Sequence, residues 1–440
     1  MSIALGWMLV AACSASHSPD SEEDGGGVLE DGGTDGAIND AGSASDADVR
    51  DALAPRCSDV PAPPCLELAS TVTFRTGEEA GGGSLQGLGY HDGPAVLYQF
   101  CFDMDGSWSS QWRLQRFTTT GSLAGDPLSL TGSFVHSAEW GGDVGTWDGE
   151  LVVAWREERP DGRPVEPATV AFDTYVSIGG APVTDPIQSV AFDATGEDGI
   201  DVALAAGLVI TDVADGLLVS RIDGPGDPMR ITTERAPFGK VRASALGPHH
   251  AVITWSEDDA DGFEMALSTE AVVVQDSMVT VRSRIFQPSP GAIWNFPHVV
   301  VIDEDVWVAR YDLDSEHLRE SRIRVAHLDT SLRRLEPDRW FAGWGGLNPG
   351  GVSLVAWQGA PWLVWRTLDA RYGASTVLYA RPIPEPACGY DVSDPVVVWR
   401  PEAGVGTFLL ATASTDALWI TVPQVSGDGT ADLYQLRSCD

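Results

Sequence analysis

The sequence predicts an all-β fold, a seven-bladed β-propeller of four-stranded blades that follows a signal peptide and a disordered acidic tether. Three observations predict it. A hairpin pattern recurs through the chain, its period is nearly constant, and one strand-like segment before the repeats has no repeat of its own. A single hairpin cannot bury its apolar face alone, so neighbouring copies must cover it.

The recurring pattern is clearest from Val241 to Gly262. A strand of small and apolar residues meets a tight turn, and a second apolar strand then leads into an acidic loop that ends in Asp261-Gly262. Asp-Gly is a typical turn dipeptide. The same pattern occurs at Gly145–Gly162 and at Val352–Gly373, which indicates a structural repeat.

The period of the repeat sets the number of blades. One position in the second strand of each copy is separated from the next by 56, 56, 44, 55, 55 and 56 residues; it is occupied by Gln99, Trp155, Thr211, Trp255, Arg310, Trp365 and Thr421. Each interval leaves room for two more strands, giving four per blade. The expected blades are 84–134, 140–191, 199–234, 241–286, 297–340, 352–400, and 406–440 completed by 66–75, in one domain of residues 66–440.

The ends of this domain predict how the ring closes. The seventh repeat holds only three strands, whereas Leu66–Arg75 reads as a strand without a blade. Adding this segment as the outer strand of the last blade removes an open sheet edge. Antiparallel pairing then brings Cys439 beside Cys65, and we expect the two to form a disulfide. The alternative is that Cys439 is an unpaired terminal thiol, since sequence alone does not determine connectivity.

The other cysteines are expected at both ends of the blades. Cys388 falls in a predicted turn near the closing junction and Cys57 in the segment that leads into it, so a second bond, Cys57–Cys388, is predicted. Cys101 is predicted on the opposite face as a free thiol. No Cys/His spacing typical of a metal site occurs.

Composition limits the classes of partner. The chain has 440 residues, and 64 acidic against 27 basic side chains give a net charge of −37. Binding to nucleic-acid phosphates needs a basic face, and so does adsorption of the domain to anionic membranes, so we expect this acidic domain to do neither. The acidic surface favours solubility, and we expect a monomeric domain. One lysine against 26 arginines is typical of a GC-rich bacterial genome.

The amino-terminal residues carry a targeting pattern. The apolar run Ile3–Ala12 is too short to span a bilayer but suits a signal peptide. Residues 9–13, Leu-Val-Ala-Ala-Cys, resemble the lipobox of bacterial lipoproteins, although residues 1–8 lack Lys and Arg. The resemblance implies removal of residues 1–12, lipidation of Cys13 and, with Ser14 next, anchoring in the outer membrane of the cell envelope. The alternative is an ordinary secretory peptide cut after Ala15.

Residues 13–56 form the expected tether. Gly, Ser, Ala, Asp and Glu dominate this segment, which has almost no large apolar side chain. Such a segment cannot offset its ordering entropy by burial. We therefore expect a solvated spacer between the membrane and the propeller.

The loops that lead into the innermost strands, together with those between second and third strands, share one face of a propeller. They are rich in tryptophan and polar residues, and the candidate ligand face comprises Glu139, Trp140, Asp193, Glu197, Lys240, Arg242, Trp294, Asn295, His298, Trp344, Asn348, Trp399, Arg400 and Glu402. Aromatic rings with a few charges suit a sugar or another flat polar ligand. The alternative is that each tryptophan packs between blades.

The sequence favours a non-enzymatic binding or scaffolding module, with a glycan or an envelope protein as the partner. The alternative function is a carbohydrate-active hydrolase or lyase that uses carboxylates near the axis. Its candidates are Glu139, Asp193, Glu197 and Glu402. No G-x-S-x-G, H-E-x-x-H or phosphate-binding loop is present, and no cofactor is predicted.

A calcium site is a further hypothesis. Glu257, Asp259 and Asp261, followed by Gly262, place oxygen ligands at alternate positions before a glycine. However, the twelfth position is Ser268, so the bidentate glutamate of a calcium loop is missing. Asp-Gly recurs at the same place in other repeats, which a plain hairpin turn also explains.

Overall fold

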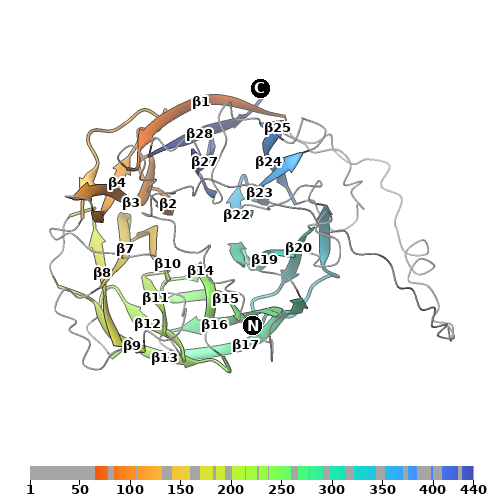
Figure 1. Ribbon diagram of the computed structural model, residues 1–440. Coiled ribbons are helices and arrows are strands. Elements are labelled where there is room, and N and C mark those ends of the chain that lie inside the picture. Colours follow the sequence, from red (N-terminus) through yellow and green to blue (C-terminus); the bar gives the residue numbers. More distant parts are fainter. Residues whose placement is uncertain are drawn as a thin grey trace, which may run out of the picture.

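The computed structural model is a ring of seven four-stranded antiparallel sheets (Figure 1), which confirms the predicted seven-bladed propeller. The structure describes residues 65–77, 84–104, 107–130, 141–158, 169–181, 185–193, 201–213, 215–224, 227–235, 237–258, 266–276, 278–290, 297–312, 322–342, 352–369, 375–383, 398–399, 409–424 and 429–439. Within these ranges no helix is both long and apolar enough to cross a membrane.

The blades are numbered from the first complete sheet. Blades 1 to 3 consist of β2 (Ser84–Tyr90), β3 (Pro94–Met104), β4 (Ser107–Arg116) and β5 (Leu128–Ser129); β6 (Gly142–Trp147), β7 (Glu150–Glu158), β8 (Thr169–Ile178) and β9 (Gln188–Asp193); and β10 (Val202–Ala205), β11 (Leu208–Val213), β12 (Gly216–Arg221) and β13 (Met229–Thr232). Blades 4 and 5 consist of β14 (Pro237–Gly247), β15 (His250–Asp258), β16 (Ala266–Gln275) and β17 (Met278–Pro290); and β18 (His298–Ile302), β19 (Asp305–Asp312), β20 (Arg322–Leu328) and β21 (Arg339–Ala342). Blade 6 consists of β22 (Val352–Trp357), β23 (Ala360–Asp369), β24 (Ser375–Pro382) and β25 (Val398–Trp399), and blade 7 of β26 (Leu410–Ala413), β27 (Leu418–Pro423), β28 (Thr430–Ser438) and β1 (Leu66–Arg75).

The ring closes as predicted, with the first strand beside the last (Figure 1). Strand β1 pairs with β28 from Leu66 opposite Ser438 to Arg75 opposite Thr430. Just beyond this ladder Cys65 and Cys439 form a disulfide, and the Cys439 N–H donates to the Cys65 carbonyl at 3.0 Å. The junction therefore joins residues 374 positions apart in the sequence.

The hydrophobic core lies between blades. Leu97 and Trp112 of blade 1 share one cluster with Val153 and Trp155 of blade 2. Burying side chains of this size contributes about 1.5–3 kcal/mol each. The fit leaves no room at Gly142, where an added Cβ would lie 2.5 Å from the Leu97 side chain. Five tryptophans serve this packing and are fully buried: Trp112, Trp155, Trp255, Trp357 and Trp419.

Tight turns join the first and second strands of the blades. At Ala206-Gly207 the φ angles are 56° and 75°, and at Gln358-Gly359 they are 53° and 72°. Two successive positive φ values define the turn whose twist matches a two-residue hairpin. These turns, with the connections between third and fourth strands, form what we call the turn face. The opposite side, with the connections between blades, is the loop face.

Candidate functional site

The predicted ligand face falls mostly outside the described residues, as do Cys13, Cys57, Cys388, Asp259 and Asp261. The face residues in this position are Glu139, Trp140, Glu197, Trp294, Asn295, Trp344, Asn348, Arg400 and Glu402. Only the backbone is described for Asp193 at the end of β9, Lys240 within β14 and Trp399 at the end of β25. Arg242 on β14 and His298 at the start of β18 are the two members with described side chains. The assembly of this face therefore stays a prediction.

Arg242 belongs to a group of charges on the innermost strands or directly before them, near the loop face. Its Nη1 donates to Asp201 Oδ2 at 3.4 Å. Asp143 of β6 pairs with Ala154 and Arg242 pairs with Thr254, so the two occupy the same level in blades 2 and 4. We call Asp143, Asp201 and Arg242 the axial charge cluster. Sequence analysis missed both aspartates.

Asp143 links two innermost strands. Its Oδ2 accepts a hydrogen bond from the Leu204 N–H at 2.8 Å, and its Oδ1 accepts from the Val144 N–H at 2.9 Å. An innermost strand has no partner on its axial edge, so its N–H groups need side-chain or solvent acceptors. Ser244 performs the same task between blades 4 and 5, where its Oγ accepts from the Val301 N–H at 2.9 Å.

Burial raises the pKa of Asp143 from 3.8 to about 6, against the opposing effect of the Arg242 charge. On β11, the second strand of blade 3, burial raises the pKa of Asp212 well above 3.8, although the Arg156 guanidinium lies 3.1 Å away. Asp212 Oδ1 also accepts from the Asp201 N–H at 2.6 Å. Perturbed carboxyl groups of this kind occur often at functional sites, but also in structural ion-pair networks.

The raised pKa of Asp143 predicts a pH dependence of stability. Between pH 4 and 6 the folded state binds more protons at this carboxyl than the unfolded state, so stability should fall as pH rises through this window. We expect a loss of about 2 kcal/mol, below the roughly 3 kcal/mol of the full shift because the side chain keeps some contact with solvent. Chemical denaturation at pH 4, 5, 6 and 7 measures it. The difference in free energy of unfolding between wild type and Asp143→Asn should change by about 2 kcal/mol between pH 4 and 6. A difference that stays constant would contradict a raised pKa of Asp143.

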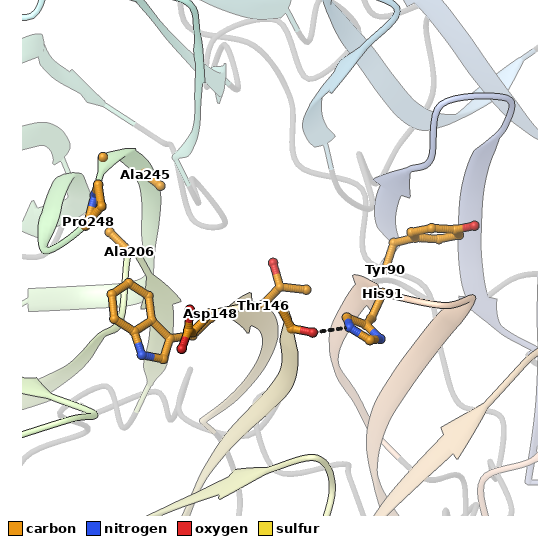
Figure 2. Close-up of a pocket in the computed structure, with 10 residues that line it drawn as sticks. Tyr90, His91, Thr146, Asp148, Ala206, Ala245 and Pro248 are labelled. Atoms are coloured by element: carbon orange, nitrogen blue, oxygen red, sulfur yellow. Dashed lines mark hydrogen bonds between the residues drawn. The ribbon is translucent and has the colours of Figure 1, made fainter.

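A shallow, open cavity of about 460 Å³ lies on the turn face (Figure 2). Turns of four successive blades line it: Tyr90, His91, Thr146, Trp147, Asp148, Gly149, Ala206, Ala245, Gly247 and Pro248. Figure 2 shows Ala206, Ala245 and Pro248 on one side and Tyr90 and His91 on the other, with Thr146 between them. We call this the axial pocket. Sequence analysis placed the ligand face on the opposite side and did not identify these residues as a site.

Trp147 provides an aromatic wall of the axial pocket. A Cβ added to Gly207 would lie 2.7 Å from its ring, so the indole packs directly on that glycine. The His249 ring lies 4.8 Å from the Trp147 ring, centroid to centroid. The backbone N–H of His249 also donates to the Ala206 carbonyl at 2.8 Å. Three adjacent blades thus hold one indole, part of which remains exposed to the cavity.

His249 is itself held by charged neighbours. Arg221 Nη2 lies 2.9 Å and Asp223 Oδ2 3.2 Å from His249 Nε2. Arg221 donates to both oxygens of Asp223, at 3.0 and 3.1 Å, and these hydrogen bonds lower the pKa of the Asp223 carboxyl. The His249 side chain is largely buried and packs against Trp147. A fixed aromatic wall costs little ordering entropy when a ligand binds.

Replacing Gly207 with alanine should lower the free energy of unfolding by about 3 kcal/mol, because it adds a left-handed backbone strain of about 1 kcal/mol to a clash with the Trp147 ring. The matched control is Gly359→Ala, since Gly359 has nearly the same φ of 72° but nothing within 4 Å of its added Cβ. Urea denaturation of both variants separates strain from clash. Equal losses would show that Trp147 does not rest on Gly207.

The calcium hypothesis can be examined only at Glu257. Its carboxylate is buried, accepts from Trp255 Nε1 at 2.9 Å and faces Arg282 at 3.5 Å. Burial raises its pKa. Among the described residues no group of three or more His, Cys, Asp or Glu side chains is arranged to hold a metal ion. The contribution of Asp259 and Asp261 stays a prediction.

Comparisons with known proteins give likeness of fold only. No protein-family model matches the chain, and no curated protein matches it significantly. One similar solved structure is BBS1N in complex with ARL6DN, at 12% identity and a TM-score of 0.40, covering 78% of this chain and 87% of that one. Another is an α-L-arabinofuranosidase from Fusarium graminearum in complex with an iminosugar inhibitor, at 8% identity and a TM-score of 0.42, covering 80% of this chain and 93% of that one. At this similarity neither bears on function.

Proposed function

We propose that this protein is a lipid-anchored, extracytoplasmic binding module whose propeller binds a saccharide ring in the axial pocket. The observation that carries the proposal is the Trp147 indole, fixed on Gly207 at the edge of a cavity of about 460 Å³. Sugars stack their C–H faces on aromatic rings and direct their hydroxyls to polar groups. The turn backbone and the His91 and Asp148 side chains surround this cavity with donors and acceptors.

The anchor and location form part of the same proposal. The lipobox-like residues 9–13 support lipidation of Cys13, and the acidic segment that follows would hold the propeller away from the bacterial envelope membrane. Growth with a radiolabelled fatty acid tests this. Label should enter the wild-type protein and be absent from Cys13→Ala, and label retained by the variant would contradict an anchor at this residue.

The ligand is tested with a panel of envelope polysaccharides and neutral glycans immobilised on a solid support. We expect retention of the protein on at least one glycan without release of product. Trp147→Ala should lower retention at least tenfold, whereas the control Trp340→Ala removes an indole that is 43% exposed on β21 and should have no effect. Equal retention by wild type and Trp147→Ala would exclude the axial pocket as the binding site.

A second candidate function is a carbohydrate-active hydrolase or lyase. The observation that favours it is the axial charge cluster, where the pKa of Asp143 is about 6 and Asp201 contacts Arg242. A carboxyl whose pKa is raised toward neutral pH suits a general acid. Release of soluble product in the same panel, abolished by Asp143→Asn but not by Trp147→Ala, would establish this function in place of the first.

A further inference from the structure

A second cavity adjoins the axial pocket on the turn face. It has a volume of about 510 Å³ and lies between blades 1 and 2. Residues from both blades line it, among them His91, Arg116, Thr118, Thr119, Glu150 and Gly179. His91 lines both cavities, and Gly149 of the axial pocket is followed directly by Glu150 of the second one.

One imidazole forms the shared wall. His91 Nε2 donates across the blade interface to the Gly149 carbonyl at 2.5 Å, the bond drawn in Figure 2. Its Nδ1 lies 3.3 Å from Asp92 Oδ2, and the side chain is 29% exposed. A hydrogen bond at such a site is exchanged for one to water or to a ligand at little net cost. His91 is thus a partly exposed side chain shared by the two cavities.

The second cavity has the chemistry of a polyhydroxylated ligand. Thr118 and Thr119 offer hydroxyls, Glu150 offers carboxylate oxygens, and Arg116 offers donors. Arg116 Nη2 is directed to the Gly179 carbonyl, while its Nε–H is buried without an acceptor among the described residues. Sugar hydroxyls both donate and accept, so they satisfy such a mixed set. The mixed charges and the net charge of −37 disfavour a polyanion.

We propose that the two cavities form one groove for a neutral linear oligosaccharide. One sugar ring stacks on Trp147 in the axial pocket, and the sugar units that follow it extend past His91 toward Arg116. This inference rests on the proposed function and specifies its ligand as a chain rather than a single sugar. An extended peptide is the less suitable occupant. Peptides gain affinity by pairing with a free strand edge, and hairpin turns and strand ends line this groove.

The test measures affinity against ligand length, using cello- and chito-oligosaccharides of one to six residues and titration calorimetry on the full-length protein. Affinity should rise at least tenfold from one to three residues in the series that binds and then level off. Arg116→Met should remove most of that gain, and Glu150→Gln should reduce it. The matched control Arg230→Met changes an exposed arginine on β13 and should leave the dependence of affinity on oligosaccharide length unchanged.

The outcomes separate the groove from the proposed function. Binding that requires Trp147 but is independent of length and of Arg116 would overturn the groove while leaving the single-ring pocket in place. No binding of any length in either series would overturn the groove, and the proposed function would fall as well if the glycan panel also retained nothing. Binding of a neutral extended peptide in place of both sugar series would replace the oligosaccharide as occupant. A melting temperature for Arg116→Met within a few degrees of wild type confirms that the variant is folded.

Discussion

Replacing Arg156 with methionine should lower the free energy of unfolding by about 3–5 kcal/mol, the cost of leaving a buried charge without its partner. Arg156 of β7 and Asp212 of β11 are 1% and 0% exposed, and the guanidinium donates at 3.1 Å to the carboxylate and at 3.2 Å to the Asp212 carbonyl. Without the arginine, Asp212 must either stay charged in the core or take up a proton. The loss should therefore be larger at pH 7 than at pH 5.

A second substitution identifies the cause. Arg156→Met combined with Asp212→Asn should recover at least half of the lost free energy of unfolding. The amide oxygen at position 212 can still accept from the Asp201 N–H, and neither of the two substituted side chains carries a charge. The surface ion pair of Arg230 and Asp215 supplies the control, since its side chains are 51% and 59% exposed and Arg230→Met should change stability very little. If the double variant is as unstable as the single one, lost packing rather than the stranded charge explains the effect.

Removing the closing disulfide with Cys65→Ser and Cys439→Ser should lower the free energy of unfolding by about 4 kcal/mol, since the bond closes a loop of several hundred residues in the unfolded chain. The fold itself should survive, because the β1–β28 ladder and the burial of Phe74 against blades 1 and 7 remain. Guanidinium denaturation of the double variant and of the wild type measures the difference.

The reducing agent serves as the internal control. Reduced wild type should match the oxidised double variant, apart from any other disulfide in the chain. A further loss on reducing the double variant would support the predicted Cys57–Cys388 bond, which lies outside the described residues. Identical denaturation curves for oxidised wild type and the double variant would show that the bond does not stabilise the ring.

The architecture could be predicted because it depends on patterns that act locally and repeat. Alternation of apolar and polar residues marks strands, Asp-Gly and Gly-containing turns mark hairpins, and the period counts the blades. The segment Leu66–Arg75, which belongs to no complete repeat, could then pair only with the last blade, because that blade lacked an outer strand. The antiparallel register that followed placed Cys65 beside Cys439, and the structure confirms both.

The candidate site could not be predicted in the same way, because its parts come from different blades. The indole of Trp147 owes its position to Gly207 and His249, and neither glycine nor turn histidine signals a pocket by itself. One signal was present but not used: Arg156 and Asp212 are 56 residues apart, which is one repeat, so they occupy equivalent positions in adjacent blades. A search for opposite charges at equal repeat positions would have found this pair.

Sequence alone predicted the fold class, seven blades and the way the ring closes, since each follows from short-range periodicity and from the need to cover sheet edges and apolar faces. The tertiary structure alone decided which side of the ring carries a cavity in the described residues and which charges meet near the axis. These depend on how far neighbouring blades approach one another. That distance is set by side-chain packing at each interface, as at Gly142 and Gly207, and not by the pattern within any single repeat.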